Sequence, residues 1–276
     1  QPFTYGSSEP QLLRLELSAH QHELHGEDSL FMYDNSSFGV ADGVGGWNGV
    51  QGGNPKEFSR RIMENCKSEL DAIVNNPEGD GNAYINSKEL LVRASTPVIN
   101  DESLLGGSTA LIGMIIDQNI LSVANVGDSR FYLFRRFPDR NAPVLYFISP
   151  EQRYSFNAPM QLSPRAYLEK SALAVDPAKW TEYYELPVTH GDVIVFVTDG
   201  VSDNLFPQEL NQLVIDLYKK HSNSERDLSE HLAKGIVRAA VDKQEGVSNI
   251  KEAPFGTPKP DDTTCVVAVC VSTAMQ

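Results

Sequence analysis

Residues Phe38–Trp47 read FGVADGVGGW, and this stretch decides the fold of the chain. The apolar run Phe38–Ala41 predicts a short buried strand that ends in Asp42 before a glycine-rich bend. A carboxylate at a rigid strand end, beside the exposed backbone carbonyl of Gly43, forms half of a site for a hard cation such as Mg²⁺ or Mn²⁺. Because most Asp-Gly pairs are only turns, the pair indicates a site only if it has partners elsewhere.

Acidic residues also stand at the ends of other predicted strands. The apolar run 192–198 predicts a buried strand that ends in Asp199-Gly200, which repeats the Asp-Gly arrangement. The last predicted strand covers 263–271 and opens on an acidic pair. The other acids at strand ends, or directly beside them, are Glu27, Asp28, Asp128, Asp203, Asp261 and Asp262.

Any one of these acids suits a turn, but their joint pattern indicates a cation site. Two unit charges about 4 Å apart repel by roughly 4 kcal/mol at an effective dielectric constant of about 20, so gathered carboxylates need cations. Oxygen-only ligands favour Mg²⁺, Mn²⁺ or Ca²⁺ over zinc or copper. The sequence contains no P-loop, GxGxxG fingerprint or Ser-His-Asp elbow that would compete with this interpretation.

The rest of the chain alternates between strand and helix patterns. Residues 29–33 and 38–41 predict a hairpin, and apolar residues three and four apart predict an amphipathic helix over 54–74. Residues 150–180 contain four prolines and little periodicity, which is typical of a functional lid or a disordered segment. Without repeats or a clear linker, we expect one domain over 1–276. Further strands are predicted at 108–117, 120–126, 131–135 and 144–148, and further helices at 88–98, 166–174, 207–218 and 224–241.

Composition narrows the class of partner and compartment. The net charge is −14, from 37 acidic and 23 basic residues, which disfavours nucleic acid as a partner. The longest apolar run, Cys265–Val271, is too short to span a bilayer, so we expect no transmembrane segment. Cys66, Cys265 and Cys270 fall on apolar patterns without CxxC spacing, which predicts reduced core thiols in an intracellular compartment.

Six motifs in order, spanning about Gly26 to Val271, resemble the metal-dependent protein phosphatase family, type 2C. Two of its segments, VADGVGGW and FNAPMQL at Phe156–Leu162, are more similar to the mitochondrial branch of that family than to its large cytosolic branch. The six motifs are GED, VADGVGGW, GGSTA, NVGDSR, VTDGVSDN and DDTT.

The resemblance implies an α+β fold, a four-layer αββα sandwich of two antiparallel sheets flanked by helices. It implies two Mg²⁺ or Mn²⁺ ions in a cleft at one edge. It places Asp42 between the two ions, Gly43 on one through its carbonyl, Glu27 on the second, and Asp199 and Asp261 on the first. The remaining acids take supporting roles: Asp28 and Asp262 behind the ligands, and Asp128 and Asp203 with Asp199 at a weaker third ion.

Two positions depart from the cytosolic pattern. The family's cytosolic members carry a His directly after the first Asp-Gly, proposed as general acid, where this chain has Val44. They carry a phosphate-binding Arg where this chain has Glu23. The resemblance therefore leaves a metal-bound water as the acid, and leaves the phosphate to the metals alone or with His22 or His25. Together with His20, these histidines have alternate spacing, which favours an exposed strand end over a metal site.

The resemblance implies hydrolysis of phosphoserine and phosphothreonine by a water that bridges the two metals, with phosphorylated proteins as substrates. The branch implies the mitochondrial matrix and its phosphoproteins, including enzymes of coenzyme Q biosynthesis. The sequence leaves the oligomeric state open, and we expect a monomer. Two alternatives remain open: a catalytically inactive family member that serves as a metal-stabilised binding module, and a Ca²⁺-dependent structural domain. The 150–180 segment falls where the family carries a variable flap.

Overall fold

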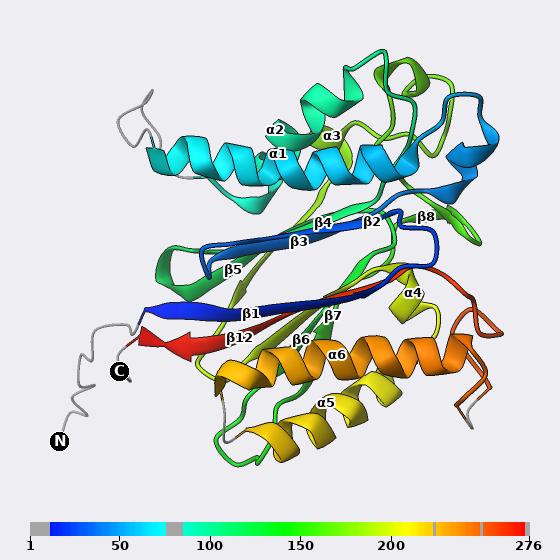
Figure 1. Cartoon of the computed structure of the whole chain (residues 1–276). Helices are drawn as coiled ribbons and strands as arrows, with labels where there is room; N and C mark the ends of the chain where they lie inside the picture. Colours follow the sequence, from blue (N-terminus) through cyan, green and yellow to red (C-terminus); the bar gives the residue numbers. More distant parts are fainter. Residues whose placement is uncertain (1–11, 76–84, 223–224, 249–250, 274–276) are drawn as a thin grey trace.

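Two antiparallel sheets form the centre of the molecule, and helices cover the outer face of each (Figure 1). This computed structural model describes residues 12–75, 85–222, 225–248 and 251–273. The layers run helix, sheet, sheet, helix, which confirms the predicted αββα sandwich. None of the helices in these ranges is long and apolar enough to cross a membrane.

The first sheet joins strands from the two ends of the chain. β1 (Leu13–His22) pairs along its whole length with β12 (Thr263–Ser272). Helices α5 (Pro207–His221) and α6 (Glu225–Gln244) cover its outer face (Figure 1). The strand order is β1, β12, β11 (Val193–Val197), β6 (Arg130–Arg135) and β7 (Val144–Ile148).

The second sheet contains the strand predicted from the opening stretch, β3 (Ser37–Asp42). β2 (Asp28–Tyr33) forms a hairpin with it, so that Asp28 lies opposite Asp42. The sequence did not predict the edge strand β10 (Glu182–Pro187), because it is only partly buried and carries no continuous apolar run. The strand order is β10, β5 (Ile120–Val126), β4 (Ala110–Ile116), β3 and β2, and α1 (Pro55–Asn75) and α2 (Ser87–Ile99) cover the sheet.

Aromatic side chains set how the two sheets pack. Phe38 of β3 and Phe196 of β11 are fully buried, with ring centroids 4.5 Å apart. Gly113 of β4 leaves room for this contact, because a Cβ there would lie 2.6 Å from Phe196 Cζ. Removing one such ring typically costs about 3–5 kcal/mol. The contact holds β3 against β11, and both strands end at the same edge of the sandwich (Figure 1).

The segment 150–180 is more regular than the sequence predicted. It holds the two-stranded pair β8 (Arg153–Ser155) and β9 (Ala158–Pro159) and the 3-10 turn η3 (Arg165–Tyr167). The helix expected over 166–174 is wrong, since only η3 forms there. A short helix instead follows at α3 (Pro177–Trp180), where the Asp176 carboxylate accepts from the Ala178 N–H. Two other short turns are η1 (Gly45–Gly49) and η2 (Asp117–Asn119).

Candidate metal centre

The two Asp-Gly pairs end strands of opposite sheets and meet in one cleft. Asp42 is the last residue of β3, and Asp199 follows β11 as the first residue of the short helix α4 (Asp199–Ser202). Both line a cleft of about 260 Å³. The other residues predicted from the sequence that line the same cleft are Glu27, Gly43, Asp128 and Asp261.

The carboxylates in this cleft disfavour one another's ionised forms. Burial, and then the negative charges of Asp199 and Asp28, raise the pKa of Asp42 well above its usual value. Burial and the charge of Asp199 likewise raise the pKa of Asp128 to about 7, although a neighbouring arginine opposes the shift. The cleft is therefore a site where added positive charge is favourable.

Glycine is required at position 43 because another segment passes very close to it. A Cβ on Gly43 would lie 2.7 Å from the Pro55 carbonyl oxygen. The Gly43 N–H donates to the Glu27 carbonyl at 3.1 Å, and the Ser59 hydroxyl donates to the same oxygen at 2.6 Å. The Asn48 amide donates to Glu27 Oε1 at 2.5 Å. The start of α1 and the turn η1 thus hold Glu27 beside Gly43.

Asp262 organises the loop that carries Glu27. Its Oδ1 accepts the backbone N–H groups of Leu24, His25 and Gly26, at 2.5, 2.7 and 3.1 Å. Its Oδ2 accepts the Glu27 N–H at 2.6 Å. Burial would raise the pKa of Asp262, but these four donors outweigh it and lower the pKa. Asp262 is therefore an ionised anchor behind the cleft.

Asp28 lies behind Asp42 and is held by hydroxyl groups. Its Oδ2 accepts from Thr198 Oγ1 at 2.8 Å and from Thr264 Oγ1 at 2.7 Å. Thr198 directly precedes Asp199, and Thr264 lies at the start of β12, three residues after Asp261. Asp28 thus links the ends of β11 and β12 to the β2–β3 hairpin.

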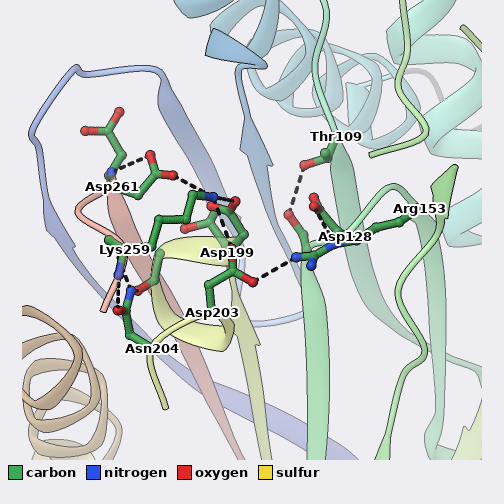
Figure 2. Close-up of polar contacts among 12 residues, drawn as sticks. Thr109, Asp128, Arg153, Asp199, Asp203, Asn204, Lys259 and Asp261 are labelled. Atoms are coloured by element: carbon green, nitrogen blue, oxygen red, sulfur yellow. Dashed lines mark hydrogen bonds and ion pairs between the residues drawn. The ribbon is translucent and has the colours of Figure 1, made fainter. Parts of the chain in front are cut away.

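A lysine that the sequence analysis missed lies among these acids (Figure 2). Lys259 Nζ is 2.5 Å from Asp199 Oδ2 and 3.0 Å from Asp261 Oδ2. Burial would lower the pKa of Lys259, but the surrounding carboxylates outweigh it and raise the pKa. Asn204 fixes the lysine backbone, since its side chain bonds to the Lys259 N–H and C=O at 2.9 Å each. The spacing of Lys259, two residues before Asp261, was the available signal.

An arginine from the 150–180 segment also enters the cluster. Arg153 Nε lies 3.0 Å from Asp128 Oδ2, and its Nη2 lies 2.8 Å from Asp203 Oδ1 (Figure 2). No local pattern in the sequence indicated this arginine, because the segment around it has no periodicity.

Buried oxygens without partners bear directly on metal binding. Asp28 Oδ1, Asp128 Oδ1 and Asp199 Oδ1 are buried and accept no hydrogen bond, which is rare for carboxylates. A hard cation would satisfy the Asp199 acceptor, and the oxygen donors of Glu27, Asp42, Gly43, Asp199 and Asp261 are of the type that Mg²⁺ or Mn²⁺ takes. Within the described ranges no group of three or more His, Cys, Asp or Glu side chains is arranged to hold a metal ion. Lys259 pairs with both Asp199 and Asp261.

Two of the acids expected at a third ion are paired with side-chain cations. Both oxygens of Asp203 are ion-paired, Oδ1 with Arg153 and Oδ2 with Lys259 at 3.0 Å. Asp128 also has one oxygen on Arg153. Side-chain cations therefore pair with both oxygens of Asp203 and with one oxygen of Asp128.

The two positions that depart from the cytosolic pattern differ in their location. Val44 lines the cleft, whereas Glu23 is exposed and lies outside its lining. Of the two histidines considered for the phosphate, both are exposed; His25 lines the cleft, whereas His22, at the end of β1, does not.

Comparisons with known proteins give a consistent result. A family model described as protein phosphatase 2C matches residues 27–142. The chain is 30% identical over 283 residues to "Protein phosphatase PTC7 homolog fig" of Drosophila virilis, covering 95% of this chain and 84% of that protein. It is 27% identical over 261 residues to "Protein phosphatase 2C homolog 7, mitochondrial" of Saccharomyces cerevisiae, covering 88% of this chain and 73% of that protein.

Other relatives are longer than this chain. The chain is 30% identical over 250 residues to "Probable protein phosphatase 2C BIPP2C1" of rice (Oryza sativa subsp. japonica), covering 88% of this chain but spanning only 39% of that protein.

Solved structures share the fold. The photosystem II phosphatase PBCP aligns with a TM-score of 0.67 at 24% identity, covering 92% of this chain and 98% of that one. The catalytic domain of the serine/threonine phosphatase PstP, solved with two manganese ions, aligns with a TM-score of 0.53 at 16% identity, covering 95% and 100%.

Proposed function

This chain belongs to the protein phosphatase 2C family, and from that premise we propose that it hydrolyses phosphoserine and phosphothreonine in proteins with two divalent cations. One observation carries the proposal. Acids from both sheets, Asp42 of β3 and Asp199 after β11, converge with Glu27 and Asp261 in one cleft. Such a set of oxygen donors fits Mg²⁺ or Mn²⁺.

Some residues of the cleft would hold the cations, and others hold those ligands in position. When bound, two divalent cations would activate a water for in-line attack and offset charge on the phosphate. Asp42 at the end of β3 lines the cleft together with Asp199, which follows a strand of the opposite sheet. Asp262 holds the loop of Glu27, and Asp28 accepts from Thr198, the residue before Asp199. These bonds keep the ligand geometry in place before the cations arrive.

The leaving oxygen receives its proton from water and not from position 44. Val44 lines the cleft but carries no exchangeable proton on its side chain. Cys66, Cys265 and Cys270 are all buried, and burial raises the pKa of each thiol, so none serves as a nucleophile. Direct attack by water without a covalent intermediate is the mechanism consistent with both observations.

A hollow beside the cleft supports a peptide substrate over a small phosphate ester. Its volume is about 600 Å³, and the rings of Trp47 and Tyr167, 4.9 Å apart, form an apolar wall. The Trp47 indole donates to Gln161 Oε1 at 2.7 Å, which fixes that wall. We infer that an apolar side chain next to the phosphorylated residue packs here. The hollow and the cleft share Val44, Gly46, Asn157 and Pro159.

The central experiment compares Asp42→Asn with a matched control, Asp34→Asn. Asp34 lies in the turn at the other end of the same hairpin and has a positive φ of 40°, which asparagine tolerates. On a phosphothreonine peptide with Mn²⁺, we expect D42N to lose turnover with an unchanged circular dichroism spectrum, and D34N to keep it. Full activity of D42N with Mn²⁺ would overturn the two-metal assignment.

The same assay separates the alternative functions. Mn²⁺ binding without hydrolysis of any phosphate ester would favour the inactive binding module. Stabilisation by Ca²⁺ alone, without activity in Mg²⁺ or Mn²⁺, would favour a structural calcium domain. For the hollow, Tyr167→Ser should lower kcat/KM on a peptide with leucine beside the phosphothreonine but not on p-nitrophenyl phosphate. An equal loss on both substrates would contradict the hollow as a peptide site.

We propose the mitochondrial matrix as the site of action, with its phosphoproteins, including enzymes of coenzyme Q biosynthesis, as the substrate pool. Support comes from the S. cerevisiae relative, whose name places that protein in mitochondria, at 27% identity. Fractionation of cells that express the natural protein would test this, and its recovery outside mitochondria would refute it.

A further inference from the structure

The 150–180 segment is fastened to the metal centre at two successive residues. The Gln152 side chain accepts the Gly127 N–H at 2.8 Å, and the Gln152 N–H donates to the Gly127 carbonyl at 2.9 Å. The next residue, Arg153, pairs with Asp128 and Asp203 at 3.0 and 2.8 Å (Figure 2). Gln152 and Arg153 therefore bind the backbone of Gly127 and the carboxylate of Asp128, respectively.

The Arg153 guanidinium pairs with carboxylate oxygens of Asp128 and Asp203 that a third cation would need as ligands. With Lys259 on the second oxygen of Asp203, only Asp128 Oδ1 and Asp199 Oδ1 remain without a partner in this corner of the cluster. Asp203 and Asp128 are nearly fully buried, with 3% and 1% of their surface exposed. A divalent ion placed between them would lie against the guanidinium and would be repelled by it.

We propose that Arg153 takes the place of a third metal ion and fastens the 150–180 segment to the metal centre. The proposal rests on the two-metal site proposed above. Asp128 and Asp203 then stabilise the segment instead of binding a cation. Arg153 is accordingly a positioning residue, which acts on the cleft through the segment that carries it.

These contacts hold in place a part of the segment that forms one wall of the cleft. β8 begins at Arg153 and pairs with β9, where Pro159 lines the cleft and the neighbouring Asn157 does the same. Phe156 at the tip of this pair packs on Phe255, with ring centroids 4.7 Å apart. Losing the Arg153 pairs would leave the inner end of β8 held by the Gln152–Gly127 bonds, while the outer contact stays.

The first test counts metal ions by equilibrium dialysis against Mn²⁺, with metal analysis of the folded protein. The wild type should saturate at two ions. Arg153→Gln should saturate at three, since it frees the second oxygen of Asp128 and one of Asp203. The double variant R153Q with Asp203→Asn should return to two. The control Arg165→Gln removes another arginine of the segment, which bonds Asn100 and not the cleft acids, and should stay at two.

The second test measures amide hydrogen exchange over 151–160 in the metal-loaded protein. We expect R153Q to raise the exchange rate there by about tenfold or more, and R165Q to leave it unchanged. Three Mn²⁺ ions in the wild type, or two in a folded R153Q with unchanged exchange, would overturn the proposal. If R153Q does not fold, the wild-type count alone decides. Fewer than two ions in the wild type would instead refute the two-metal function.

Discussion

Replacing Asp262 with asparagine should weaken both the fold and the metal site. The carboxylate accepts four backbone N–H groups, three at Oδ1 and that of Glu27 at Oδ2. The asparagine oxygen can keep the three donors, but its NH₂ group then faces the Glu27 N–H. A hydrogen bond to a charged group contributes about 1.5–3 kcal/mol, so we expect D262N to lose roughly 2 kcal/mol of unfolding free energy.

The same change should reduce metal affinity, because the lost bond positions the backbone of Glu27. Loss of a partner behind a metal ligand typically costs about 10–100-fold in affinity, and we expect a Mn²⁺ dissociation constant higher by that factor. The assays are urea unfolding of the metal-free protein, followed by circular dichroism, and titration calorimetry with Mn²⁺.

Asp192 supplies a matched control at the opposite end of β11. It is also buried, and its carboxylate accepts the backbone N–H groups of Arg136 and Thr189 at 2.9 and 3.0 Å. Asp192→Asn should lose a similar unfolding free energy and keep the wild-type Mn²⁺ affinity. If D262N also kept that affinity while losing stability, Asp262 would be a structural residue only, and our reasoning on the loop would be refuted.

Two further predictions follow from the cleft. The pKa of Asp128 is raised to about 7 in the folded protein, so the stability that its protonated form contributes is present at low pH and is lost as the pH rises through 7. The chelator-treated protein should therefore have a higher melting temperature at pH 6 than at pH 8. An equal dependence of melting temperature on pH in Asp128→Asn would contradict this. Gly200→Ala would place a Cβ 1.9 Å from the Asp262 carbonyl oxygen, so we expect it to lose roughly 1–3 kcal/mol of unfolding free energy in urea. The control Gly49→Ala, where no atom lies within 4 Å of the added Cβ, should lose less than about 0.5 kcal/mol. Equal losses would show that the clash at position 200 is relieved by movement of neighbouring atoms.

Much of the fold could be predicted because it depends on neighbours in the chain. The apolar run before Asp42 predicted β3, and the helical periodicity over 54–74 predicted α1. Where local pattern was weak, prediction failed: β10 is a partly buried edge strand, and 166–174 is held as turns by contacts to other segments, such as the bond from the Gln161 N–H to the Leu173 carbonyl at 2.8 Å.

The sequence by itself determined where the acids of the site stand, because strand ends and Asp-Gly turns are set by adjacent residues. Only the tertiary structure decided what surrounds them. Lys259 reaches Asp199 across 60 positions, and Asp262 holds the Glu27 N–H across 235. Which partners these long side chains contact depends on how the two sheets pack, and no local periodicity in the sequence indicates it. The positions of the acids could therefore be predicted from the sequence, whereas the side-chain cations that pair with them could not.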